Sequence, residues 1–209
     1  MTSLSRCLCA GALLACALFA GLLPPQGVSA QAAAPAVLDE LGHGGYVILF
    51  RHAATTGKDE KAFALSDCAA QQALSEAGRA QARGIGEAFK SRKIPVGKVM
   101  ASGYCRTLET ARLAFGAAEA SDALLRPKFE PAAGMPAPPP WPQRLQMLNE
   151  LVAAAPAAPA NTILITHGES IEAIAKTQVG YAGAVIMKPD GHGAAAQVAA
   201  IRAEDWSAP

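Results

Sequence analysis

The segment Tyr46-Val47-Ile48-Leu49-Phe50-Arg51-His52 is the most informative stretch of this chain. Its apolar run has the length and composition of a buried β-strand, and a charged pair follows at once. A second run, 162–166, has the same character and is followed directly by His167. Ligands of α/β proteins bind beyond the carboxyl ends of parallel strands, where loops converge. The imidazoles of His52 and His167 and the guanidinium of Arg51 would lie at this edge, which predicts chemistry on an anion.

Composition favours one compact domain and excludes partners that are recognised by bulk charge. The chain has 209 residues, of which 51% are hydrophobic, and its net charge is +1. This length and apolar content suffice for a sizeable core. A near-neutral balance gives no reason to expect nucleic acid or a membrane surface as a partner. Any anion-binding site must therefore be local.

The N-terminus has the pattern of a secretory signal. One positive charge lies within residues 1–6, residues 8–23 are apolar and uncharged, and Val28-Ser29-Ala30 fits a small-x-small cleavage site. We expect a signal peptide at 1–30, a single domain at 31–209, a secreted or periplasmic product, and no stable membrane partner after cleavage. An uncleaved anchor is disfavoured because the apolar stretch is short for a spanning helix. Lipidation at Cys16 is disfavoured because more apolar sequence follows it.

Cysteine usage agrees with export. Two cysteines, Cys68 and Cys105, remain after the predicted signal is removed, and an even number suits an oxidising compartment. Both lie beside segments expected on the active-site side. We predict a disulfide between them, with two buried free thiols as the alternative.

Strand-like and helix-like segments alternate along the rest of the chain. This order predicts a largely parallel sheet covered by helices on both faces, a three-layer α/β/α sandwich. Ser75 is the expected N-cap of the first long helix, and Gly116 is expected to end the second. The expected strands are 46–50, 98–101, 162–166, 184–188 and 196–202, and the expected helices run from about 75 to 90, 106 to 115, 142 to 154 and 170 to 178.

Two polar or irregular segments interrupt this alternation. Residues 126–142 hold seven prolines, which excludes regular structure. We interpret them as a surface excursion that flanks the site, or as a semi-rigid connector without function. The charged residues 58–61 are interpreted as a solvated loop, although Lys58 could face a substrate.

Four side chains are candidates for phosphate chemistry. A neutral imidazole at His52 is a good nucleophile toward phosphorus, and the cation Arg51 disfavours its protonation. Arg106 is expected at the start of a helix, where free N–H groups and the helix dipole attract anions. His167 could donate to a phosphoryl oxygen and stabilise charge in the transition state. Each signal is weak alone, because most such residues in proteins are structural or simply exposed.

The order of the motifs is far more specific than any one of them. Residues 46–180 resemble the histidine phosphatase superfamily, branch 1, which includes the cofactor-dependent phosphoglycerate mutases. The resemblance is carried, in order, by Arg51-His52, by Leu74-Ser75-x-x-Gly78-x-x-Gln81-Ala82, by Ser102-x-x-x-Arg106-x-x-x-Thr110-Ala111, and by Thr166-His167-Gly168.

The resemblance implies roles for particular residues within a phosphoglycerate mutase-like fold. His52 would be the nucleophile that becomes phosphohistidine, and Arg51, Arg106 and His167 would complete the phosphate pocket. Thr55 matches the threonine of the family's Arg-His-Gly-x-Thr pattern and would help to orient the loop. No metal or nucleotide cofactor is implied, because the arginines and His167 supply the positive field. The four histidines of the chain are also too scattered to suggest a metal site.

The chain departs from the family pattern at two points. Ala53 replaces the usual glycine after the nucleophile, and the region that carries an acidic proton donor in mutases is here rich in proline. Glu169 is favoured as the general acid over Glu130, while Glu109 could instead orient an arginine. Without a dedicated acid, the protein would suit good leaving groups, such as those of phosphoramidates or acyl phosphates.

The sequence therefore predicts an exported phosphatase that hydrolyses phosphate monoesters or phosphoramidates through a phosphohistidine. Its expected partner is a phosphorylated small molecule or an envelope glycan. Two alternatives stay open: a phosphomutase, and a non-catalytic module on the same fold that binds a phospho-ligand or the envelope.

Overall fold

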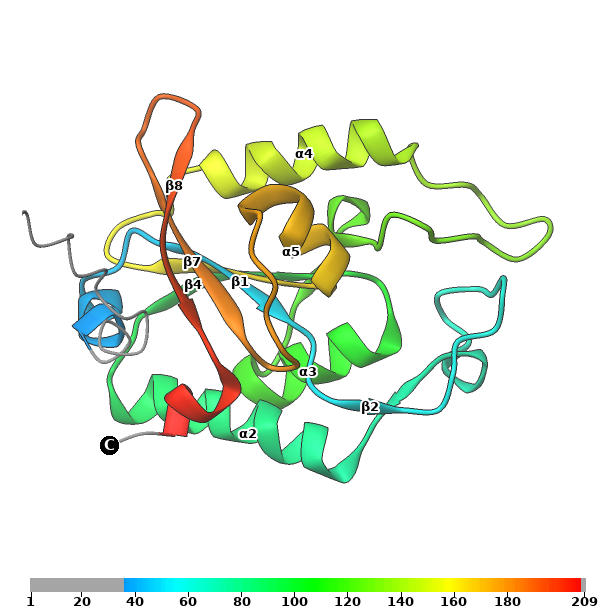
Figure 1. The fold of residues 1–209 in the computed structure, drawn as a ribbon, viewed down its shortest axis with the longest axis horizontal. Coiled ribbons are helices and arrows are strands. Elements are labelled where there is room, and N and C mark those ends of the chain that lie inside the picture. The colour runs from blue at the N-terminus through cyan, green and yellow to red at the C-terminus, as the bar shows by residue number, and fades with distance from the viewer. Residues whose placement is uncertain (1–35, 208–209) are drawn as a thin grey trace, which may run out of the picture.

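The protein is described by a computed structural model that covers residues 36–207, so the predicted signal peptide lies outside the described residues. A six-stranded sheet in the order β5-β4-β6-β1-β7-β8 forms its centre (Figure 1). Within residues 36–207 no helix combines the length and apolar character needed to span a membrane. The strands of the sheet are β1 (Val47–Arg51), β4 (Val96–Ala101), β5 (Glu119–Ala120), β6 (Asn161–Thr166), β7 (Ala184–Pro189) and β8 (Ala195–Ile201).

The sheet is mixed but mostly parallel, as predicted. Strands β5, β4, β6 and β1 are parallel to one another, whereas β7 runs antiparallel to β1 and β8 antiparallel to β7. The reversal into β8 follows from a short turn, because the backbone of Asp190 bonds to Ala194 and closes a hairpin. A second sheet consists of two short strands, β2 (Thr55–Thr56) and β3 (Ala73–Leu74), which flank the segment that contains the charged residues 58–61.

Helices cover both faces of the central sheet, which confirms the three-layer prediction (Figure 1). Strand β1 shows how the layers form, since its side chains alternate between the faces. Ile48 and Phe50 belong to the core beneath α2 (Glu76–Ser91) and α3 (Cys105–Phe115). Val47 and Leu49 belong to the core beneath α4 (Trp141–Ala153) and α5 (Gly168–Ala175). Short 3₁₀ turns are η1 (Leu41–His43), η2 (Cys68–Ala70), η3 (Asp122–Leu124) and η4 (Ala203–Ser207), and residues 36–40 are helical.

Residues at the start of α2 hold the loop that follows β1 in place through hydrogen bonds. Ser75 caps the helix as predicted, with its Oγ accepting from the amide of Gly78 at 3.0 Å. The amide of Ser75 donates to the Ala54 carbonyl at 3.0 Å, and Gln81 Oε1 accepts from the Ala54 amide at 3.0 Å. A Cβ at Gly78 would overlap the Ala54 carbonyl, so this position requires glycine. The second motif of the sequence therefore fixes the backbone two residues after His52.

The proline-rich stretch has no regular secondary structure before α4 begins, as predicted, but it is firmly held. The buried guanidinium of Arg144 donates to four of its flanking carbonyls, those of Leu125, Arg126, Pro127 and Pro139, at 2.8–3.1 Å. Hydrogen bonds from a charged donor are stronger than neutral ones. Arg144 therefore fixes both ends of the stretch.

Candidate active site

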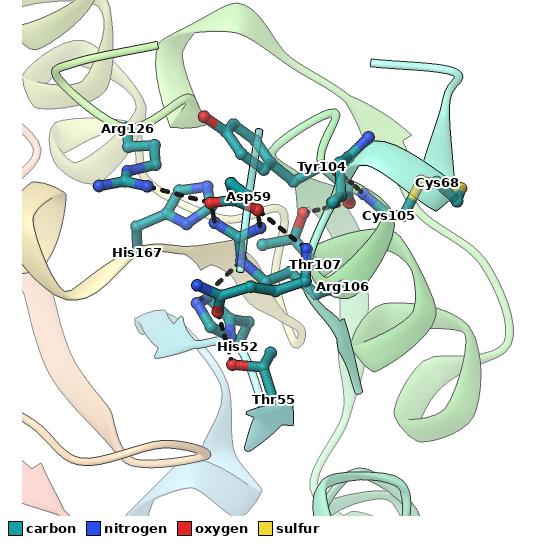
Figure 2. Close-up of polar contacts among 12 residues, drawn as sticks. His52, Thr55, Asp59, Cys68, Tyr104, Cys105, Arg106, Thr107, Arg126 and His167 are labelled. Carbon is teal, nitrogen blue, oxygen red and sulfur yellow. Dashed lines mark hydrogen bonds and ion pairs between the residues drawn. A yellow bond between two sulfur atoms is a disulfide. The ribbon is translucent and has the colours of Figure 1, made fainter. Parts of the chain in front are cut away.

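The parallel register brings the two predicted histidines together. Arg51 lies opposite Thr166 across β1 and β6, and Ala101 of β4 lies opposite Ile165 of β6. The next residues along the three strands therefore leave the sheet at one edge. The rings of His52 and His167 are 5.4 Å apart at their centroids and meet edge to face (Figure 2). Both are buried, with 5% and 1% of their surface exposed.

Hydrogen bonding sets the tautomer of His52. Its Nδ1 lies 2.9 Å from the Ala53 carbonyl oxygen, which can only accept, so Nδ1 carries the proton. The lone pair of the neutral ring then resides on Nε2, and the Nε–H of Arg106 donates to it at 3.2 Å. Ala53 has no positive φ, so alanine replaces the family's glycine here without backbone strain. His52 thus presents the reactive nitrogen that a nucleophile requires.

Both rings are neutral at neutral pH. Burial, followed by the charge of Arg106, lowers the pKa of His52 to about 3 against the opposing hydrogen bond to Ala53. Burial, followed by His52 and Arg106, lowers the pKa of His167 well below its ordinary value. The sequence interpretation gave the right direction for His52 but named Arg51 as the cause. Arg51 contributes less than burial and less than Arg106.

Protein stability should therefore fall with decreasing pH. The unfolded chain protonates His52 below about pH 6.5, whereas the folded chain does so only near pH 3, so stability present above 6.5 is lost on acidification. The expected loss is up to about 1.4 kcal/mol per pH unit for this histidine. Urea unfolding of His52→Asn across this range should show a shallower slope than wild type. His43→Asn, which alters an exposed histidine, is the control and should not change the slope.

Arg51 is held in place but keeps a free donor. Its guanidinium stacks 4.0 Å above the ring of Tyr181, and its Nη1 donates to the Val179 carbonyl at 3.0 Å. Its buried Nε has no hydrogen-bond partner among the described residues.

Asp59 lies inside the site, and its interpretation as part of a solvated loop is wrong. Its side chain is 11% exposed, whereas Lys58, Glu60 and Lys61 are indeed exposed. Its carboxylate accepts from Arg106 Nη1 and Nη2 at 2.9 and 3.3 Å and from Arg126 Nη1 at 3.1 Å (Figure 2). No sequence pattern indicated this contact, because a short run of mixed charges is typical of solvent-exposed chain.

A polar cavity of about 130 Å³ opens beside the two histidines. Five of the predicted site residues line it: Arg51, His52, Arg106, His167 and Glu169. Its lining is Arg51, His52, Gln72, Arg106, Arg126, His167, Gly168, Glu169 and Tyr181. The structure thus brings His52, Arg51, Arg106, His167 and Glu169 to one place.

Other predicted residues lie outside this lining. Thr55 reaches the cavity only through Gln72, to whose Oε1 its hydroxyl donates at 2.8 Å. Glu130 is exposed and does not line the cavity. Glu109 orients an arginine as suggested, accepting from Arg79 Nε at 2.8 Å. Glu169 is 54% exposed and binds Arg126 at 3.0 Å, so it is the acid closer to the site.

Besides Asp59, which does not line the cavity, sequence reasoning missed three residues that do line it. Arg126 stands at the head of the proline-rich stretch, and Gln72 lies just before the second motif. Tyr181 reaches the site because β7 is antiparallel and therefore begins at the edge where β1 ends. Only the last of these had a local signal, an aromatic residue in a short glycine-flanked link between a helix and a strand.

Cys68 and Cys105 form the predicted disulfide. It joins η2 to the first residue of α3, directly beside Arg106. A disulfide in a folded protein indicates an oxidising compartment. Within the described residues no group of three or more His, Cys, Asp or Glu side chains is placed to hold a metal ion.

Comparisons with known proteins agree with this fold. A family model described as the histidine phosphatase superfamily (branch 1) matches residues 47–131, a range that contains His52 and Arg106. No curated protein matches the chain. The fold and the facing histidines are typical of a histidine phosphatase-like α/β domain. Over residues 47–131 the chain is similar to branch 1 of the histidine phosphatase superfamily.

Solved structures share the fold at low sequence identity. The protein histidine phosphatase SixA, complexed with tungstate, is 14% identical and has a TM-score of 0.52, with coverage of 77% of this chain and 98% of SixA. The Rv3214 protein of Mycobacterium tuberculosis is 17% identical, with a TM-score of 0.52 and coverage of 76% and 97%. A mutant phosphoserine phosphatase from Entamoeba histolytica, in complex with phosphoserine, is 16% identical, with a TM-score of 0.50 and coverage of 77% and 98%.

Proposed function

We propose that this protein is an exported phosphatase that hydrolyses phosphate monoesters or phosphoramidates through a phosphohistidine at His52. The single observation that carries the proposal is the tautomer of His52. A buried, neutral ring holds its proton on Nδ1 and presents its Nε2 lone pair beside a cavity walled by guanidinium groups. This is the arrangement that attack on a phosphoryl group requires.

The reaction proceeds in two displacements. In the first, Nε2 of His52 attacks phosphorus, the bond to the leaving oxygen or nitrogen breaks, and the leaving atom takes the electron pair and a proton. In the second, water attacks the phosphohistidine, the P–N bond breaks, and the imidazole recovers its lone pair. Arg51 and Arg106, which line the cavity, stabilise the charge on the phosphoryl oxygens, and buried His167 completes the wall.

Glu169 is proposed as the group that protonates the leaving atom and later accepts the proton of water. It lies at the exposed edge of the cavity, on the first turn of α5, where a leaving group would depart. Arg126 fixes its carboxylate at 3.0 Å. A group that must exchange protons with solvent benefits from this partial exposure.

Glu169→Gln should lower the turnover rate, and the loss should be larger for substrates with a more basic leaving group. Turnover of an alkyl phosphate should fall by about 100-fold, while a nitrophenyl phosphate, which needs little protonation, should be nearly unaffected. Glu130→Gln is the matched control, since it removes the rival acid in the proline-rich stretch and should change neither rate. An alkyl-specific loss in Glu130→Gln instead would reverse the assignment.

Export and substrate class rest on separate grounds. The N-terminal pattern and the Cys68–Cys105 disulfide support a periplasmic or secreted location. In that location a phosphorylated small molecule or an envelope glycan is the proposed substrate. Glycolytic phosphoglycerates are cytosolic, which disfavours a mutase.

The test is a turnover assay joined to acid-quench trapping. Purified protein should hydrolyse a nitrophenyl phosphate in the presence of a chelator, and a labelled substrate should leave an acid-labile, base-stable phosphate on the protein. Binding of inorganic phosphate without turnover would point to a non-catalytic phospho-ligand module and would overturn the proposal.

A further inference from the structure

The contacts of Asp59 carry an inference about how Arg106 is oriented. Both carboxylate oxygens of Asp59 accept hydrogen bonds. The donors are three guanidinium N–H groups and the backbone N–H of Gln72. We propose that Asp59 is a positioning residue, whose carboxylate fixes the Arg106 guanidinium so that its Nε faces His52 Nε2. This inference rests on the proposed function, since it concerns the same reaction.

A guanidinium is planar and rigid, so fixing one edge and one face of it also fixes where its Nε–H points. Asp59 holds the Nη1 and Nη2 ends of Arg106, and the face of the group lies 4.3 Å above the ring of Tyr104. Its Nε–H points to His52 Nε2 at 3.2 Å, and Nη1 and Nη2 each keep a second N–H for a phosphoryl oxygen. Without the carboxylate, this long side chain would regain rotamers that place Nε elsewhere, because arginine loses much conformational freedom on ordering.

Asp59 is itself held rigidly from several sides. The backbone N–H of Gln72 donates to Oδ1 of Asp59 at 2.9 Å. The backbone N–H of Glu60 donates to the Ala70 carbonyl at 2.9 Å, and this bond joins the two ends of the loop. The disulfide then ties Cys68 of this loop to Cys105, beside Arg106. Because the loop is held in this way, Asp59 has a fixed position and can hold the Arg106 guanidinium in one orientation.

The negative charge of Asp59 distinguishes a role in positioning Arg106 from a role in binding the phosphate. A carboxylate beside a phosphate pocket repels the phosphoryl dianion, so it weakens rather than strengthens ground-state binding. Its removal should therefore leave phosphate affinity unchanged or improved while turnover falls. A residue that only supported the local fold would lower both together when replaced.

Asp59 is also not placed to deliver a proton. Its oxygens accept hydrogen bonds from four N–H groups, and it does not belong to the lining of the cavity. The proton donor proposed above, Glu169, lines the cavity instead. Loss of Asp59 should therefore slow good and poor leaving groups equally.

The experiment compares Asp59→Asn with wild type and with Glu60→Gln. Glu60 is the exposed neighbour of Asp59, so its variant makes the same change in charge in the same loop. We expect Asp59→Asn to lower kcat by about 100-fold, the size of effect that misplacing a catalytic group produces. The loss should be equal for nitrophenyl and alkyl phosphates, and the inhibition constant for inorganic phosphate should be equal to or lower than that of wild type. Glu60→Gln should match wild type, and Asp59→Glu should recover part of kcat.

Each outcome decides one of the claims. Wild-type protein without turnover would defeat the proposed function and, with it, this inference. Wild-type turnover with Asp59→Asn within about threefold of it would defeat the inference alone. A parallel loss of kcat, phosphate affinity and melting temperature would show a structural role, and a loss confined to the alkyl phosphate would show a proton donor; either result overturns positioning.

Discussion

His52→Ala should lower kcat/KM for a nitrophenyl phosphate by about 10³-fold or more and should leave no acid-labile phosphate on the protein. The expected size of the loss follows from removing the only atom that is proposed to bond to phosphorus. The remaining cavity still holds Arg51, Arg106 and His167, so inorganic phosphate should still inhibit the residual activity or bind in calorimetry. Single-turnover quench experiments with labelled substrate measure both effects.

His43→Ala is the matched control for this variant, because His43 is an exposed histidine in η1. It should retain wild-type turnover and the wild-type amount of trapped phosphate. Thermal unfolding of both variants should show cooperative transitions, which separates loss of chemistry from loss of fold. Undiminished turnover in His52→Ala would contradict the proposed mechanism.

Reduction of the Cys68–Cys105 disulfide should produce the largest change in stability. The bridge spans 37 residues, and the chain-entropy estimate for a loop of that length is about 4 kcal/mol. Cys68 lies in the segment between β2 and β3, which also carries Asp59 and Gln72, so reduced protein should also lose turnover before it unfolds globally. Urea unfolding and nitrophenyl phosphate turnover, each measured with and without a dithiol reductant, test both expectations.

The double variant Cys68→Ser with Cys105→Ser is the control for reductant effects elsewhere. It should behave like reduced wild type and should not respond to the dithiol. Equal stability and activity of oxidised and reduced wild type would show that the bridge supports neither the fold nor the site.

Local signals were enough to predict the centre of the fold. The strands β1 and β6 are continuous apolar runs because both of their faces are buried, and that pattern is visible without tertiary information. Ser75 and Gly116 mark helix ends through their own capping chemistry, and the structure places both as predicted. Strand β5 has two exposed residues and pairs only at the sheet edge, so no pattern in the sequence distinguishes it from a loop.

The site was predictable where residues follow strands and not where it depends on loops packing together. His52 and His167 are positioned by strand register, which periodicity reveals. Asp59 and Arg126 meet only because two loops, one of them held by Arg144 and the other by the disulfide, converge on Arg106. That convergence is a tertiary event between segments far apart in the sequence, and residue type alone could not indicate it.

The hairpin between β7 and β8 offers a place to attach foreign sequence. Because β7 starts at the catalytic edge and runs away from it, the exposed turn at 190–194 lies at the opposite end of the sheet (Figure 1). A purification tag or a reporter peptide grafted between Gly191 and Gly193 would extend into solvent there. Immobilising the enzyme through such a graft would present the mouth of its cavity outward, toward substrates too large to diffuse into a matrix.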